Sequence, residues 1–272
     1  MLSREIIKLS HVPEINFHSF IEQALNTALW HYVLFFNEND DIDQKLFCLL
    51  EESLSKLLFR FFCERNNLAV EFNSENGDRF LSFQIEGDNW ELINLSLKRV
   101  SAKLNFETVD LPAMIPSYKL DCKEKNEFGA KIIRWTEHDE KKVLFTYLHD
   151  NSAKECFLTL KLPKGLKQFY LDFFNQKESV KIMHESDFKK KLGALGKPDF
   201  SINHKPEFYI TAWASTEHIK FFYTSNPQDF PQIKTSCFEN KTVLIHRLPA
   251  FSRLFPQLNE KLIFAKFLTN IQ

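Results

Sequence analysis

Asp78, Ser96 and Lys98 are the residues whose types and predicted positions best suit chemistry. They fall in two segments with the alternating apolar pattern of strands, at about 78–86 and 90–99, separated by a glycine-containing turn. In an antiparallel hairpin, an aspartate and a lysine on neighbouring strands can share one polar face. A carboxylate there can hold a divalent cation, and a lysine can stabilise charge on a phosphate group.

The apolar pattern predicts the register of this hairpin. One face of each strand is apolar: Leu81, Phe83 and Ile85 on the first strand, and Ile93, Leu95 and Leu97 on the second. These faces coincide if Glu86 pairs with Trp90 around a three-residue loop, which is a common hairpin class. This register places Asp78 opposite Lys98, on the face that also carries Asn94 and Ser96. The alternative is a surface cross-strand pair, which contributes less than about 1 kcal/mol to stability.

A second arrangement of the same kind uses Asp110, Asp121 and Lys123. The acid-x-lysine step is intact at 121–123, and Asp110 precedes it by a distance that is short but sufficient for a hairpin. Pro112 and Pro116 lie between the two acids, and proline disfavours a regular ladder because it has no backbone N–H. A charged edge or loop is the alternative for these residues.

The first arrangement resembles the PD-(D/E)XK nuclease superfamily. That family places an acidic residue on one strand of a hairpin and an acid-x-lysine step on the next, often after a helix that bears a glutamate. Asp78 matches the first acid and Lys98 matches the lysine, while Ser96 stands where the second acid is expected.

The helix glutamate and the last strand of the family also have counterparts. Glu51 and Glu52 lie on a predicted helix, together with Ser55 on its less apolar side. A solvated helix face is the alternative for Glu51 and Glu52. A predicted strand and helix at about 208–224 would complete the family's sheet.

The resemblance implies a Mg²⁺-dependent DNA endonuclease, or a nuclease-like subunit of a bacterial DNA-processing or defence complex. Two carboxylates would hold Mg²⁺, which polarises the phosphate, and the lysine would orient the attacking water. The implied catalytic residues are Asp78, Lys98, Asp121 and Lys123, and the implied metal ligands are Asp78, Glu51, Asp110 and Asp121. Because a serine hydroxyl is a poor substitute for a charged ligand, Ser96 implies a weakened or inactive site.

A non-catalytic protein-binding or adaptor subunit built on a β-meander is the alternative function. The net charge of −1 gives the chain no overall attraction to phosphate, and Ser96 removes a metal-binding acid. The expected partners are therefore DNA for the nuclease, and another protein subunit or a second copy of the chain for the adaptor.

Periodicity and turn residues predict the elements that position these side chains. Helices are expected at about 17–36, 43–66, 166–176, 186–195 and 215–224, and in the tail at 254–267. Strands are expected at about 68–75, 78–86, 90–99, 118–123, 208–213 and 242–247, with an antiparallel meander at 129–136, 142–149 and 154–162.

His149 and Asp150 fall at a strand end and are expected to be exposed turn residues. Lys189, Lys190 and Lys191 are expected on a solvated helix face, with contact to a phosphate backbone as the alternative.

These elements indicate an α+β fold with a mixed, largely antiparallel sheet and N-terminal helices packed on one face. The hydrophobic fraction of 44% is sufficient for one large core, so a single domain over 1–272 is expected. Within it, residues 1–66 form a mainly helical part and residues 67–272 a strand-rich part.

Several classes of protein are disfavoured by what the sequence lacks. With six glycines and no GxxxxGK[ST] or GxGxxG motif, a nucleotide cofactor is not expected. The five cysteines form no CxxC pair, which argues against a zinc site or a disulfide scaffold. No run approaches the roughly 18 apolar residues that cross a bilayer, so we expect a cytoplasmic protein without membrane contact.

Overall fold

The structure is a computed structural model of the chain. It describes residues 6–9, 12–34, 41–72, 81–96, 108–110, 119–121, 134–136, 141–150, 152, 155–175, 185–196, 198–224, 242–255 and 258. Asp78, Lys98, Lys123 and nearly all of the predicted C-terminal helix therefore lie outside the described residues.

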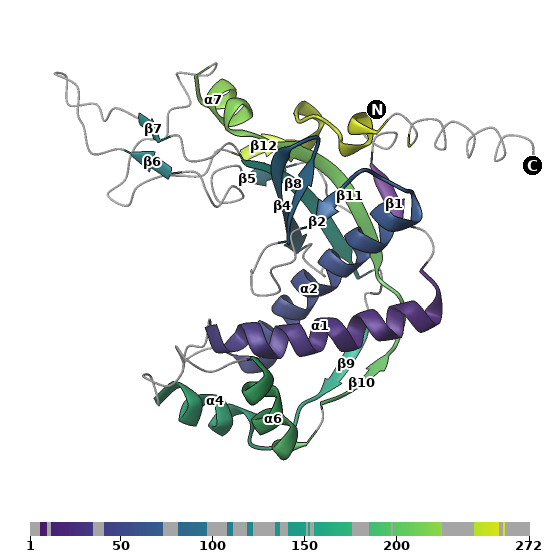
Figure 1. The fold of residues 1–272 in the computed structure, drawn as a ribbon, viewed down its shortest axis with the longest axis vertical. Coiled ribbons are helices and arrows are strands. Elements are labelled where there is room, and N and C mark those ends of the chain that lie inside the picture. Colours follow the sequence, from purple (N-terminus) through teal and green to yellow (C-terminus); the bar gives the residue numbers. More distant parts are fainter. Residues whose placement is uncertain are drawn as a thin grey trace, which may run out of the picture.

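A six-stranded mixed sheet lies at the centre of the fold (Figure 1). Its strands, in order across the sheet, are β1 (Ile7–Leu9), β11 (Glu207–Ala214), β8 (Lys141–His149), β4 (Asp88–Ser96), β3 (Leu81–Ile85) and β2 (Glu71–Phe72). Within this sheet β4 and β8 are parallel, and every other neighbouring pair is antiparallel. The predicted α+β class with a mixed, largely antiparallel sheet is confirmed.

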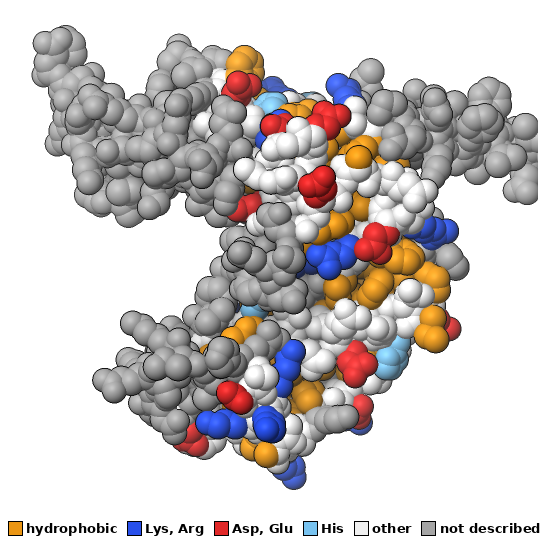
Figure 2. All heavy atoms as spheres, in the orientation of Figure 1, with side chains coloured by type: hydrophobic (Ala, Val, Ile, Leu, Met, Phe, Trp, Pro, Cys, Tyr) orange, Lys and Arg blue, Asp and Glu red, His pale blue; other side chains and the backbone are white. Residues whose placement is uncertain are grey.

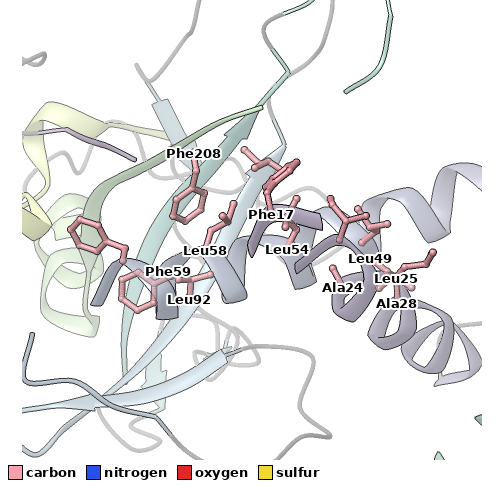
Figure 3. Close-up of a cluster of buried hydrophobic side chains, with 14 of the residues drawn as sticks. Phe17, Ala24, Leu25, Ala28, Leu49, Leu54, Leu58, Phe59, Leu92 and Phe208 are labelled. Carbon is pink, nitrogen blue, oxygen red and sulfur yellow. The ribbon is translucent and has the colours of Figure 1, made fainter. Parts of the chain in front are cut away.

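Two long helices, α1 (Glu14–Leu34) and α2 (Ile42–Arg65), pack together on one face of the sheet. The side chain of Asp41 caps α2 by accepting hydrogen bonds from the N–H groups of Asp43 and Gln44, at 3.1 and 3.3 Å. Figure 3 shows Phe59 of α2 beside Leu92 of β4 in the resulting core. The two predicted N-terminal helices and their position are thus confirmed.

The central strands β4 and β8 are buried on both faces. Trp90, Leu92 and Leu144 belong to the large cluster that includes α1 and α2, while Ile93 and Phe145 belong to a second cluster on the opposite face. Helix α7 (Thr216–Thr224) and strand β12 (Thr242–Leu244) contribute to that second cluster. A strand in this position is apolar on both sides, as parallel strands usually are.

The predicted register of the β3–β4 hairpin is wrong because β4 is apolar on both faces. Ile85 pairs with Asp88 around a two-residue turn, and Phe83 pairs with Trp90. Both turn residues, Glu86 and Gly87, have positive φ (53° and 84°), as a type I′ turn requires. The prediction aligned β3 with the Ile93 face of β4 instead. The register that placed Asp78 directly opposite Lys98 is therefore not the register of the described hairpin.

The predicted meander over 129–162 is also wrong, because the described strands in this range pair elsewhere. Strand β7 (Arg134–Thr136) pairs with β6 (Lys119–Asp121), and β9 (Leu158–Lys161) pairs with β10 (Asp199–Ile202). Strand β8 joins the central sheet between β4 and β11. A further two-stranded sheet joins β5 (Thr108–Asp110) to β12.

The described residues between 155 and 205 form a lobe inserted between the neighbouring strands β8 and β11. It contains the β9–β10 ribbon and the predicted helices, observed as α4 (Leu166–Asn175) and α6 (Glu185–Leu195). The lobe packs on α1, since the Tyr170 hydroxyl donates to the carbonyl of Leu29 at 2.8 Å and Phe188 contacts Trp30. Figure 1 shows the lobe on the side of α1 away from the sheet.

The chain continues after β12 through two short 3-10 helices, η3 (Ile245–Arg247) and η4 (Phe251–Leu254). The predicted last strand at 242–247 thus ends earlier than expected. Among the described helices, none combines the length and apolar character needed to cross a membrane.

Candidate functional site

The predicted acids Asp110 and Asp121 lie in different two-stranded sheets. Asp110 ends β5 and pairs with Thr242 of β12, whereas Asp121 ends β6 and pairs with Arg134 of β7. Their strands are therefore not the two arms of one hairpin, as the second arrangement required. The sequence between the two acids contains Pro112 and Pro116, and proline disfavours a regular ladder because it has no backbone N–H.

Helix α2 runs antiparallel to β4, so that α2 begins near the end of the strand and ends near its start. Near the end of α2, the Phe59 ring contacts Phe83 of β3, with centroids 5.1 Å apart. Near its start, Phe47 contacts Phe157, with centroids 5.5 Å apart. The N–H of Phe157 donates at 2.8 Å to Asp150, which directly follows β8. Because β8 is parallel to β4, both strands end near the first half of α2.

Glu51, Ser55 and Phe59 follow one another at intervals of four residues along α2, and Ser55 and Phe59 are buried. Residues four positions apart lie on the same side of a helix, and Phe59 is in the core. Ser55 has 0% of its surface exposed, and its hydroxyl donates to the carbonyl of Glu51 at 2.8 Å. Ser55 is therefore part of the core, whereas Glu51 and Glu52 are partly exposed, so the alternative of a solvated face for these two glutamates is not contradicted. Glu51, which is partly buried, lies one helical turn before Ser55, in the first half of α2.

Polar residues occupy the last part of β4 and the adjoining part of β8. The rest of the interface between these strands and α2 is apolar. Asn94 pairs with Thr146 of β8, which is fully buried. The Thr146 hydroxyl donates to the carbonyl of Ile93 at 3.3 Å. The Asn94 side-chain oxygen is enclosed and has no hydrogen-bond partner among the described residues. Ser96 ends the strand two positions beyond Asn94.

Strand β3 begins and strand β4 ends at the same end of the sheet. Leu81, the first residue of β3, pairs with Leu92, and Ser96 lies four residues beyond Leu92 on the antiparallel strand. Asp78 is three residues before Leu81, and Lys98 is two residues after Ser96. We define this end of the sheet, with Glu51, Ser55, Asn94, Thr146 and Ser96, as the strand-end site.

The strand-end site does not by itself contain a full ligand set for Mg²⁺. Among the described residues, no three His, Cys, Asp or Glu side chains are placed to hold one metal ion. Glu51 is the one carboxylate among the residues that define the site, and Asp150, which directly follows β8 at the same end of the sheet, is hydrogen-bonded to Phe157 and His204. Glu91 is buried on β4, but it alternates with Trp90 and Leu92 and lies on the opposite face of the strand.

Ser55 and Thr146 are members of the site to which the sequence interpretation gave no role. A signal was available for Ser55, because its spacing of four residues from both Glu51 and Phe59 places the three on one side of the helix. Asn94 was assigned to the polar face of the hairpin, but Thr146 could not be found from sequence, since its contact with β4 joins segments far apart in the chain.

A second polar cluster joins the lobe to the sheet. Asp150 is buried, and its Oδ1 lies 2.6 Å from Nε2 of His204. Burial acts to raise the pKa of Asp150, but hydrogen bonds from His204 and from the N–H groups of Phe157 and Ser152 hold it below its usual range. The expectation that Asp150 and the neighbouring His149 are exposed is wrong, because both are buried.

A third cluster ties the first strand to the sheet. Glu207 forms an ion pair with Lys8 and accepts a hydrogen bond from the Tyr209 hydroxyl at 2.5 Å. Burial acts to raise the pKa of Glu207, but these hydrogen bonds and the charges of Lys8 and His149 lower it. These contacts hold β1 against β11.

Comparison with known proteins adds no relative: no family model matches the chain, and no curated protein or solved structure is significantly similar to it. The assignment of function therefore depends on the geometry of the chain itself.

Proposed function

We propose that the chain is a nuclease-like protein of the PD-(D/E)XK type that acts on DNA at the strand-end site. The observation that carries this proposal is the convergence of three segments on one end of the sheet. These are the Glu51 side of α2, the end of β4 that leads to Lys98, and the start of β3 that Asp78 precedes.

The order of elements supports the same proposal. A helix that bears Glu51 precedes a β2–β3–β4 antiparallel run, which is the arrangement that the resemblance implies. Strand β11 and helix α7 follow later in the chain and lie at the positions of the expected last strand and helix. One difference is that β8 lies between β4 and β11 in the sheet.

The test is cleavage of supercoiled and linear DNA with Mg²⁺ or Mn²⁺, comparing Glu51→Gln with Glu52→Gln. Both variants remove one carboxylate from adjacent positions of the same helix, so they match in charge and helix propensity. Glu51→Gln is expected to reduce cleavage at least about tenfold, since loss of a metal-binding carboxylate costs transition-state stabilisation. Glu52→Gln is expected to retain wild-type activity, and equal effects of the two variants would contradict the proposal.

A non-catalytic subunit is the second candidate function, favoured by serine at position 96. Its partner would be another protein or a second copy of the chain. This candidate predicts a stable complex or dimer in solution and no DNA cleavage with either metal. Robust cleavage that Lys98→Ala abolishes would exclude it.

A further inference from the structure

The inserted lobe carries a group of exposed basic side chains that the strand-end site does not use. The exposed lysines that the structure describes there are Lys161 on β9, Lys164 just before α4, Lys167 in its first turn, Lys189, Lys190 and Lys191 on α6, and Lys205, which donates to the carbonyl of Val12. The exposed acidic side chains described in the lobe are Glu155, Asp172, Asp187 and Asp199. Figure 2 shows basic side chains over the part of the molecule where α4 and α6 lie, with acidic ones among them.

Helix α6 holds its three consecutive lysines on a fixed surface. Phe188 and Leu192, one turn apart, are buried on its inner side. The Phe188 ring contacts Trp30 of α1 and Tyr170 of α4, with centroids 5.2 and 6.3 Å apart. Because packing fixes the rotation of α6, the three positions between Phe188 and Leu192 are held on the solvent side.

We propose that the lysine face, defined as Lys189, Lys190 and Lys191, contacts the phosphate backbone of double-stranded DNA. The inference rests on the proposed action on DNA and adds a surface that positions the duplex. Lysine ammonium groups contact phosphates as point charges and carry no sequence information. The chain has a net charge of −1, so its attraction to a duplex has to come from a local basic surface.

The geometry favours a backbone contact over recognition of bases. The three lysines follow one another on a single exposed arc, and the structure describes no exposed aromatic side chain on α6 that could stack on an unpaired base. A helix that presents charge without a stacking surface suits a duplex more than a single strand.

The test measures duplex binding as a function of salt, with EDTA present so that cleavage plays no part. The triple variant Lys189→Gln/Lys190→Gln/Lys191→Gln is compared with the matched Lys189→Arg/Lys190→Arg/Lys191→Arg, which keeps the charges and a similar helix propensity. Each phosphate contact contributes about 0.9 to the slope of log K against log salt, so the Gln variant is expected to lower the slope by roughly 2 to 3. Its affinity at about 0.1 M salt should fall at least about tenfold, while the Arg variant should retain wild-type values.

The outcomes separate this inference from the proposed function. If the folded Gln variant binds duplex DNA with the wild-type slope, the lysine face is overturned while the proposed action on DNA stands. If the wild-type chain neither binds nor cleaves duplex DNA, both proposals fail. A thermal melt of each variant shows that a lower slope does not reflect unfolding.

Discussion

At the scale of single residues, Ser96 decides how a nuclease-like site in this chain would perform. It ends β4 two positions after Asn94, whose partner on β8 is the buried Thr146, and two positions before Lys98. A hydroxyl brings no charge to a divalent cation, whereas a carboxylate is the ligand that Mg²⁺ favours. The identity of this side chain, rather than the backbone around it, is therefore the difference from the acid-x-lysine pattern.

Replacing Ser96 with aspartate is expected to increase Mg²⁺-dependent DNA cleavage at least about tenfold, because the substitution restores the missing acid. The measurement is the initial rate of plasmid relaxation with Mg²⁺ and with EDTA. Ser96→Asn is the matched control, since it adds a side-chain oxygen of similar size without the charge. Equal rates for the two variants, both folded by thermal melting, would remove position 96 from the site.

At the scale of elements, the turn between β3 and β4 carries a local conflict that a substitution can relieve. Glu86 has a φ of 53°, in the left-handed region that costs a residue with a side chain roughly 1 kcal/mol. Asparagine tolerates this conformation and is preferred before glycine in a type I′ turn. Gly87 already occupies the second turn position with a φ of 84°.

Glu86→Asn is accordingly expected to raise the free energy of unfolding by about 0.5–1 kcal/mol. Denaturant unfolding at neutral pH measures the change. Glu86→Ala serves as the comparison, because alanine removes the same carboxylate without favouring a positive φ. A gain in stability for alanine as large as that for asparagine would argue against the two-residue turn.

The elements also show which parts of the fold the sequence could predict. Helices α1, α2, α4 and α6 were predicted because each has one apolar side at helical spacing. The hairpin register was not predicted, because β4 is buried on both faces. Alternation alone then cannot tell whether the Trp90 face or the Ile93 face of β4 continues the apolar face of β3. The burial of Ser55 on α2 was not predicted either, since a small serine reads as polar in the pattern wherever it lies.

At the scale of the whole molecule, the contacts that sequence could not predict are those between distant segments. The parallel pairing of β4 with β8 crosses more than forty residues, and it places Thr146 in the strand-end site. The lobe is likewise an insertion whose two ends meet only in the folded chain. Asp150 follows β8 and His204 precedes β11, so their contact closes the base of the lobe.

Asp150→Asn is expected to loosen this base and to destabilise the protein by about 1–3 kcal/mol at pH 7, since a buried carboxylate with several hydrogen bonds loses its charge. Because the folded protein lowers the pKa of Asp150 from an ordinary value of 3.8, its contribution is present above about pH 4 and is lost as the pH falls through the lower folded pKa. The difference in stability between wild type and variant should therefore shrink below about pH 4. Denaturant unfolding across pH measures this difference. The control is Asp187→Asn, which removes an exposed carboxylate from the same lobe and is expected to change stability little at any pH.

Hydrogen exchange should show faster opening of residues 155–205 than of the central sheet in Asp150→Asn. Uniform opening of both parts would mean that the Asp150–His204 contact does not hold the lobe in particular.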